Sequence, residues 1–315
     1  MNTSAGRRHA GPSAASGADS RGTLGKGWIT ALAVGVVLLL VVVVAGTVAV
    51  LRDDPSGRWA AGAATPSGSV SLAPDPSPTP SPTPAEFDLD ALKLPTIESV
   101  MPWMPRSGAT RLDDLPGTVA VPKAERTAVW AEPDVSEAPS FALPSTQYDY
   151  DARWLVLRTE GDWVQVLLPY GRGALPSSDP GSVNGTAGWV RGEAVRVEQE
   201  SRSIVIDLSD RTVTVNTDDG QTVVPAGIGA PGTPTPQGVS QVMTVTMASN
   251  TGLSVFLSAQ SESLDTFAGV DYAATAMHVG VGQGQAISNG CIRLTPEGLD
   301  AVKNLPAGVP VMVRA

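Results

Sequence analysis

One cysteine and one histidine lie close together near the C-terminal end of the chain. Cys291 is the only cysteine in 315 residues, and His278 precedes it by thirteen positions. A thiol attacks a carbonyl only as its thiolate, so it needs a neighbouring base to remove its proton. Both residues stand in glycine-rich sequence, where glycines allow a tight turn and leave backbone N–H groups free to bind an oxyanion. The pattern predicts a cysteine–histidine site for acyl transfer.

Three alternative roles of Cys291 stay open at this point. A lone cysteine can also be a buried small hydrophobe, half of an intermolecular disulfide, or a redox-sensing thiol. Redox sensors often use a second, resolving cysteine, which this sequence does not contain. His9 and His278 are the only histidines, and no residue spacing resembles a zinc or calcium site. We therefore expect no metal and no cofactor.

The elements that must position this site are mainly strands. Apolar residues alternate with polar ones from Ser201 onward, as in half-buried strands, and Asp219-Gly220 predicts a hairpin turn. Thr295 and Pro296 predict the start of a short helix that ends near Leu305. Further strands are expected at 204–208, 213–215, 221–227, 242–247 and 309–313.

The site sequence itself resembles a known family. The block Ser288-Asn289-Gly290-Cys291-Ile292-Arg293-Leu294, preceded by His278, resembles the signature of the L,D-transpeptidase (YkuD-type) family. The segment TPTPQG at 233–238 resembles the TPxG segment of that family, SIVIDLSDRTVTV resembles its first hairpin, and the tail at 299–313 resembles its ending. The resemblance covers residues 201–315, and it implies a mainly β catalytic domain of the YkuD-like β-sandwich type.

The resemblance also implies roles for individual residues. Cys291 would be the nucleophile and His278 the general base, with the backbone N–H groups of Cys291 and Gly290 as the oxyanion hole. The substrate would be the peptide stems of peptidoglycan, as acyl donor and acceptor, joined by 3→3 cross-links through a cysteine thioester. Carbapenem-type β-lactams would be covalent ligands of the same thiol. The expected substrate-binding residues are Arg293, Ser288, Asn289, Val279 and Tyr272.

Several of these roles have alternatives. Arg293 either orients the stem through charge-assisted hydrogen bonds or forms a structural ion pair that steadies the cysteine loop. Ser288 is expected to be a hydrogen-bonding residue of the loop rather than a catalyst. Many family members have His where this chain has Asn289 and Gly where it has Val279, which leaves open the carbonyl that orients His278. The region 248–276, with Phe267 and Tyr272, is either a lid over the cleft or an ordinary surface connection.

A second β-rich region precedes this domain. Short strands are expected at 154–157, 163–166 and 188–190, separated by Gly, Asp and Pro turns. The order WLVLRTEGDWVQVLLP followed by GTAGWVRGEAVRV resembles bacterial SH3-like, wall-associated domains, which are small β-barrels. Its tryptophans either line a ligand groove or, as we expect, pack in the core and at the barrel rim.

The N-terminal part of the chain predicts a membrane anchor. Residues 27–51 carry no charge and are long enough to cross a bilayer as a helix. Arg7, Arg8, Arg21 and Lys26 precede them, which predicts a cytoplasmic N-terminus and an extracytoplasmic catalytic domain at the cell membrane. A cleaved signal peptide is the alternative, although its apolar region would normally be shorter. Alternating prolines at 74–84 predict an extended spacer.

The net charge limits the possible partners, and the segments described above give an expected domain division. With 21 basic and 31 acidic residues the formal net charge is −10, which argues against nucleic acid as a partner. The expected division is a cytoplasmic tail at 1–27, a transmembrane helix at 28–51, a linker at 52–85, a connector at 86–117, an SH3-like domain at 118–200 and the catalytic domain at 201–315. An L,D-carboxypeptidase that trims tetrapeptide stems, or a non-catalytic wall-binding protein, remain the alternative functions.

Overall fold

The computed structural model describes residues 87–148 and 150–315. These residues belong to one unit that contains two β-sheet assemblies, here called the first module (118–200) and the second module (201–315). Within the described residues, no helix has both the length and the apolar character needed to cross a bilayer. The tail, transmembrane helix and linker predicted for residues 1–85 lie outside the described residues.

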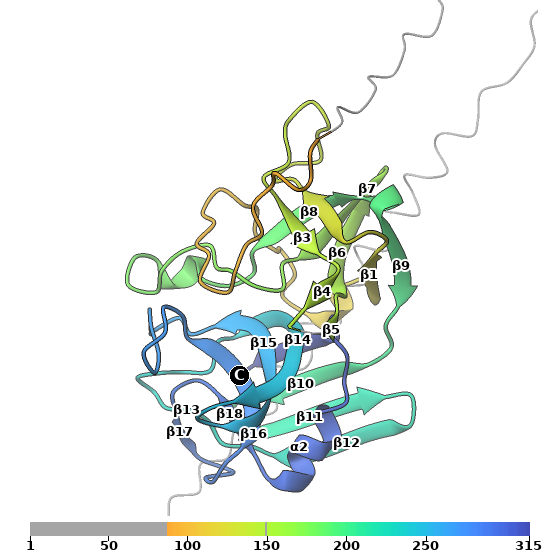
Figure 1. The fold of residues 1–315 in the computed structure, drawn as a ribbon. Coiled ribbons are helices and arrows are strands. Elements are labelled where there is room, and N and C mark those ends of the chain that lie inside the picture. The colour runs from red at the N-terminus through yellow and green to blue at the C-terminus, as the bar shows by residue number, and fades with distance from the viewer. Residues whose placement is uncertain (1–86, 149) are drawn as a thin grey trace, which may run out of the picture. The chain divides into compact units, whose positions relative to one another are not determined.

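The first module is built around a five-stranded antiparallel sheet in the order β8-β7-β6-β1-β9, with two small hairpins, β2-β3 and β4-β5 (Figure 1). Its strands are β1 (Thr118–Pro122), β2 (Arg126–Val129), β3 (Phe141–Pro144), β4 (Thr146–Gln147), β5 (Tyr150–Asp151), β6 (Trp154–Glu160), β7 (Trp163–Leu167), β8 (Ala187–Arg191) and β9 (Val195–Gln199). Two 3-10 helices, η2 (Pro180–Ser182) and η3 (Gly192–Ala194), lie between strands. The strands predicted at 154–157, 163–166 and 188–190 are confirmed as β6, β7 and β8. The SH3-like assignment stays a prediction.

The tryptophans of this module pack in its interior. Trp154 and Trp189 are fully buried, and Trp130 packs edge-to-face against Trp163 with their ring centroids 5.2 Å apart. Arg158 lies over the ring of Trp189 at 4.9 Å. Edge-to-face rings and a cation over an aromatic face are both favourable arrangements. The expectation that these rings serve packing is therefore confirmed.

The second module holds an eight-stranded sheet in the order β12-β11-β10-β19-β14-β15-β16-β18, and a parallel pair β13-β17 (Figure 1). Its elements are β10 (Ser203–Asp207), β11 (Thr212–Thr217), β12 (Gly220–Pro225), β13 (Ile228–Gly229), β14 (Gly238–Ala248), β15 (Gly252–Gln260), β16 (Ala274–Val279), β17 (Ala286–Ser288), β18 (Ile292–Leu294), α2 (Pro296–Val302) and β19 (Pro310–Arg314). The core of this module contains Ile204, Met277, Ile292, Leu294 and Val311, none of which is exposed.

Local sequence explains the single α-helix of the described residues. Thr295 caps α2 because its hydroxyl accepts a hydrogen bond of 3.1 Å from the N–H of Gly298, and Pro296 occupies the first helical position. The helix ends at Val302, earlier than the predicted end near Leu305. The chain then turns twice before it enters β19, which pairs with β10 in parallel and with β14 antiparallel.

The region 248–276 differs from both sequence-based interpretations. All of β15 and the start of β16 lie inside it, and β15 is a central strand between β14 and β16. Residues 249–251 form the turn between β14 and β15, and residues 261–273 form the longer connection outside the sheet. The strand was missed because Gly252, Ser254 and Ser258 interrupt its apolar pattern, although most of its residues are buried by neighbouring strands.

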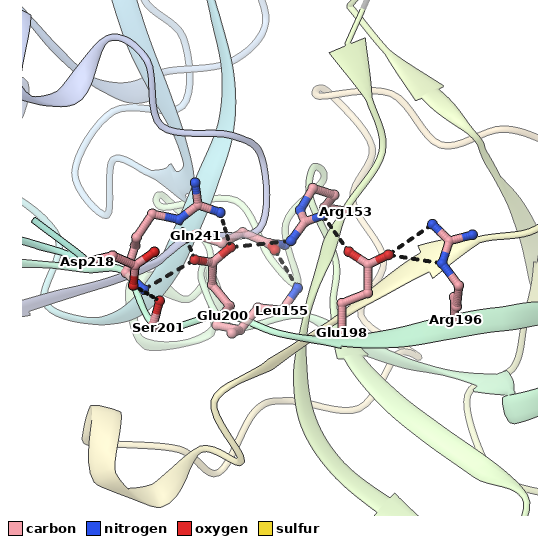
Figure 2. A network of polar contacts seen from close by, with 9 residues as sticks. Arg153, Leu155, Arg196, Glu198, Glu200, Ser201, Asp218 and Gln241 are labelled. Atoms are coloured by element: carbon pink, nitrogen blue, oxygen red, sulfur yellow. Dashed lines mark hydrogen bonds and ion pairs between the residues drawn. The ribbon is translucent and has the colours of Figure 1, made fainter.

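The two modules pack against each other through buried contacts. Met243 of β14 belongs to the apolar core of the first module, and Phe256, Tyr272 and Ala274 pack against that core. At the junction, the carboxylate of Glu200 forms ion pairs with the guanidinium groups of Arg202, at an N–O distance of 2.6 Å, and of Arg153, at 3.3 Å. Arg153 also forms an ion pair with Glu198 (Figure 2). The connector before β1 is largely irregular, with one 3-10 helix, η1 (Leu112–Asp114).

Candidate active site

Strand pairing brings Cys291 and His278 to one face of the sheet. The parallel pair β16-β18 places Met277 opposite Ile292 and His278 opposite Arg293. Cys291 immediately precedes β18, so it lies beside Ala276. Because alternate residues of a strand point to opposite faces, Met277 and Ile292 enter the core while His278, Arg293 and Cys291 share the other face. The predicted nucleophile and base are thus diagonal neighbours on adjacent strands.

His278 is held in one tautomer. Its ring is buried, with 8% exposed, and Nδ1 lies 2.9 Å from the carbonyl oxygen of Val279. A carbonyl oxygen only accepts hydrogen bonds, so Nδ1 carries the proton and Nε2 keeps its lone pair when the ring is neutral. This identifies the carbonyl that orients the imidazole, a point that the sequence left open. Val279 supplies it through its backbone, and its side chain is exposed.

The environment keeps the imidazole neutral. Burial lowers the pKa of His278, the positive charge of Arg293 lowers it further, and the hydrogen bond to Val279 partly opposes both effects. Burial of a group that is charged when protonated disfavours the protonated form. At neutral pH His278 is therefore a base with a free nitrogen on the same face as the thiol.

The surroundings of Cys291 favour a neutral thiol. Burial raises the pKa of the thiol, while the backbone of Ala276 and the positive charge of Arg293 act in the opposite direction. The Sγ atom lies 4.0 Å from the carbonyl oxygen of Ala274. Burial dominates, so the thiolate must form as the proton leaves for a base during attack.

A buried serine supports the turn that carries the cysteine. The hydroxyl of Ser288 donates to the carbonyl of Cys291 at 2.5 Å and accepts from the N–H of Gly290 at 3.2 Å. Gly290 has φ +107, a conformation that side chains rarely adopt. Within the described residues the N–H of Cys291 has no acceptor, whereas that of Gly290 is already bonded to Ser288. Ser288 is thus confirmed as a loop hydrogen-bonding residue.

The segment that resembles TPxG braces this turn from the other side. Thr233 donates its hydroxyl to the carbonyl of Ser288 at 2.9 Å, and the N–H of Ala230 donates to the same oxygen at 2.9 Å. Thr235 accepts a hydrogen bond from the N–H of Gly229 at 2.9 Å. A Cβ at Gly229 would lie only 2.3 Å from the N atom of Thr235, so this close approach requires glycine.

Arg293 makes no ion pair with any carboxylate of residues 87–148 and 150–315. Its backbone exchanges two hydrogen bonds of 2.8 Å with Gly227, and its side chain packs over Gly280. A structural ion pair at Arg293, one of the two interpretations drawn from the sequence, is therefore absent from the described residues. Its charge instead acts on the pKa values of both His278 and Cys291.

A cavity of about 300 Å³ opens beside Cys291. Its lining includes Tyr272, a predicted site residue, and four residues that sequence reasoning missed: Thr244, Phe256, Tyr148 and Ile97. No local sequence signal marks these four, because only the folded chain brings them together. Val279 and Asn289 do not line the cavity, and both are exposed. His278 is also outside the lining.

Comparison with known proteins identifies the second module. Residues 201–313 match the YkuD family model, the L,D-transpeptidase catalytic domain. The YkuD domain therefore occupies the part of the chain that the motifs indicated, and it carries both Cys291 and His278. This agrees with an enzyme of the L,D-transpeptidase type. A comparison with curated proteins found no match.

Several solved structures resemble the chain weakly. L,D-transpeptidase 3 from Mycobacterium tuberculosis is 17% identical, with a TM-score of 0.32, and the match covers 42% of this chain and 76% of that one. The same protein with a faropenem-derived adduct is 16% identical, with a TM-score of 0.31, 49% of this chain and 91% of that one covered. An L,D-transpeptidase from Mycobacterium smegmatis is 18% identical, with a TM-score of 0.30 and coverage of 49% and 91%.

Proposed function

We propose that this protein is a peptidoglycan L,D-transpeptidase that forms 3→3 cross-links through a thioester on Cys291. The observation that carries the proposal is the shared face of Cys291 and His278 beside a cavity, inside a YkuD domain. A neutral imidazole with its Nε2 free and a neutral thiol are the resting pair that general-base activation of a nucleophile requires.

The first half-reaction transfers an acyl group to the enzyme. Cys291 Sγ attacks the carbonyl between the third and fourth residues of a tetrapeptide stem as Nε2 of His278 takes the thiol proton. The N–H of Cys291 stabilises the negative oxygen of the tetrahedral intermediate. The C–N bond then breaks, His278 returns the proton to the departing D-Ala amine, and a thioester remains on Cys291.

The second half-reaction releases the product. The side-chain amine of the third residue of another stem attacks the thioester carbonyl and loses a proton to His278. The C–S bond breaks, the new amide is the 3→3 cross-link, and the thiolate regains the proton. Water in place of the amine would give a tripeptide, which is the carboxypeptidase alternative. The sequence predicted an oxyanion hole made by the N–H groups of Cys291 and Gly290. In this scheme only the N–H of Cys291 forms it, because the N–H of Gly290 donates to the hydroxyl of Ser288.

Arg293 is proposed to act in two ways. Its charge favours the thiolate of Cys291 and the neutral ring of His278, and its guanidinium has no carboxylate partner in the described residues, so it can bind a carboxylate or carbonyl of the stem. Asn289, exposed in the cysteine turn, and Val279, exposed next to His278 at the end of β16, are proposed to contact the outer part of the substrate. Tyr272 contacts the substrate inside the cavity.

Location and inhibition complete the proposal. The helix predicted at 28–51 would anchor the protein in the cell membrane, with the catalytic domain on the wall side. Carbapenem-type β-lactams would acylate Cys291, and a faropenem-derived adduct on a mycobacterial L,D-transpeptidase supports testing this class of compound.

The test uses the full-length protein with purified disaccharide-tetrapeptide, and mass spectrometry of the products. We expect a cross-linked dimer that lacks one D-Ala, and no product with Cys291→Ala. Tripeptide alone would change the proposal to a carboxypeptidase. No turnover and no meropenem adduct would favour the non-catalytic wall-binding protein.

A further inference from the structure

One wall of the cavity beside Cys291 comes from outside the catalytic domain. Tyr148, at the tip of the β4-β5 hairpin of the first module, lines this cavity, and so does Ile97 of the connector. Ile97 is held by the second module, since Gln260 donates a hydrogen bond of 2.8 Å to its carbonyl. The cavity is therefore shared between the two modules.

The conformation of Tyr148 points to a specific role. Its φ is +47, in the left-handed region that bulky side chains rarely adopt. Such strain persists only where the surroundings hold it, and it is concentrated at ligand sites. Tyr272 lines the same cavity as Tyr148. Burial raises the pKa of Tyr148, and the nearby Tyr272 raises it further. They belong to different modules.

The second module contributes an unpaired hydroxyl to the same cavity. Strand pairing aligns Thr244 with Phe256, Phe256 with Ala276, and Ala276 with the position of Cys291. These residues form one row across the face of the sheet that carries the thiol. Thr244 is 3% exposed, and its Oγ1 has no hydrogen-bond partner within the described residues. A buried hydroxyl without a partner is costly, and a ligand in the cavity would satisfy it.

The first module also fixes the loop at 265–271, which lines another part of the cavity. Arg172, 2% exposed, donates to the carbonyl of Asp265 at 3.1 Å and to that of Asp271 at 3.0 Å. Phe267 and Val270 exchange backbone hydrogen bonds between these two anchor points, and both line the cavity. The loop is thereby held at both ends by one guanidinium of the first module.

We infer that Tyr148 is a specificity-determining residue of the acyl-donor pocket, contributed by the first module, and this rests on the proposed transpeptidase function. The cavity lining contains no charged side chain. An acceptor stem carries an amine that is protonated in water, and the cavity has no carboxylate to pair with that positive charge. The uncharged backbone and aliphatic part of the donor stem fit this lining. The ring of Tyr148 would pack against the donor stem, and the hydroxyl of Thr244 would form a hydrogen bond with one amide of the stem.

The experiment compares Tyr148→Ala with Tyr150→Ala in the full-length protein. Tyr150 lies two residues away across the same turn, is similarly exposed, and does not line the cavity. We expect Tyr148→Ala to raise KM for the tetrapeptide donor by about 3- to 10-fold with little change in kcat, since one aromatic contact is lost. Tyr148→Phe should keep the KM of the parent, and Tyr150→Ala should match the parent.

A second readout does not depend on turnover. Cys291 is alkylated with iodoacetamide, which is small, and with N-(1-pyrenyl)maleimide, which is bulky. Tyr148→Ala should raise the rate of alkylation by the bulky reagent and leave the rate with iodoacetamide unchanged. Tyr150→Ala should change neither rate. Equal effects of the two alanine variants in both assays would overturn the proposal. Absence of product with the parent protein would overturn the transpeptidase function instead, and the ratio of alkylation rates would still decide whether Tyr148 forms the wall.

Discussion

The side chain of Gln241 joins the two modules through the backbone of Leu155. Its Oε1 accepts a hydrogen bond of 2.7 Å from the N–H of Leu155, and its Nε2 donates one of 2.8 Å to the carbonyl of Leu167. Gln241 is fully buried. It belongs to the same junction as the Arg153 and Glu200 contacts (Figure 2). The catalytic domain is therefore docked on the first module through groups that are costly to leave unpaired.

Gln241→Leu should destabilise the protein by about 2–4 kcal/mol, because two buried backbone groups lose their partner in an otherwise preserved volume. Urea unfolding followed by tryptophan fluorescence measures this change. Gln221→Leu is the matched control, since Gln221 is exposed and, among the described residues, its side chain forms a hydrogen bond only with Asn216. A Gln241→Leu variant as stable as the control would mean that water readily replaces the amide at the junction.

The pH dependence of Cys291 alkylation should reveal a neutral thiol. Because burial raises the thiol pKa, the alkylation rate with iodoacetamide should keep rising with pH past the ordinary cysteine value of about 8.5. Removing the charge in Arg293→Met should move the inflection to still higher pH, since Arg293 favours the thiolate. An inflection near neutral pH would instead indicate a preformed thiolate–imidazolium pair.

Protonation of His278 should set the acid limb of the pH–rate profile of turnover. Its pKa is lowered, so the neutral base persists below the ordinary histidine value of about 6.5, and activity should be lost only below that pH. Arg293→Met should shift the acid limb to higher pH, because the positive charge of Arg293 disfavours protonation of the His278 ring. Rates of D-Ala release measured across the acid and neutral range locate this inflection in the parent and in the variant. An acid limb at the same pH in both proteins would show that Arg293 does not act on the ring.

Much of this site could be predicted from local sequence. The cap of α2 by Thr295 depends on neighbouring residues alone, and so does the order of the motif around Cys291. The predicted hairpin is also present, with its turn at Asp218 and Asp219, one residue before the predicted Asp219-Gly220. The expected proximity of Cys291 and His278 is confirmed, because β16 and β18 are adjacent.

The remaining features depend on packing between distant segments. Strand β15 has too many small and polar residues to be recognised, yet its central position buries it. Tyr148 lies in a hairpin far from Cys291 along the chain, and only docking of the modules brings it to the cavity. The partner of the Gly290 N–H likewise depends on how deeply Ser288 is buried, which the sequence does not encode locally.

Gly290→Ala should lower kcat/KM for the donor stem by about 10- to 100-fold. The space is adequate, since an added Cβ would lie 3.5 Å from the carbonyl oxygen of Pro234. The cost arises from φ +107, which strains a side-chain-bearing residue by about 1–3 kcal/mol and displaces the adjacent Cys291 N–H. Gly108→Ala, where nothing lies within 4 Å of the added Cβ, should leave activity unchanged. Equal activity of the two variants would show that the turn tolerates the strain.

Arg172→Lys should loosen the loop between Asp265 and Asp271. A single ammonium cannot bridge two carbonyls as the planar guanidinium does, so one end of the loop is released. We expect faster limited proteolysis within residues 265–271 and a KM for the donor raised by about 3- to 10-fold, from the loss of one charge-assisted hydrogen bond. The value of kcat should change little, because Arg172 contacts neither Cys291 nor His278.

Arg196→Lys is the control for that substitution, since Arg196 is exposed and, among the described residues, forms an ion pair only with Glu198. It should leave both proteolysis and KM unchanged. If Arg172→Lys lowered kcat without changing KM, the loop would be acting on the chemical step rather than on donor binding. If proteolysis and KM both stayed at the parent values, the second hydrogen bond of Arg172 would be dispensable, and the loop would be held by the bond from Ser177 to Asp265 instead.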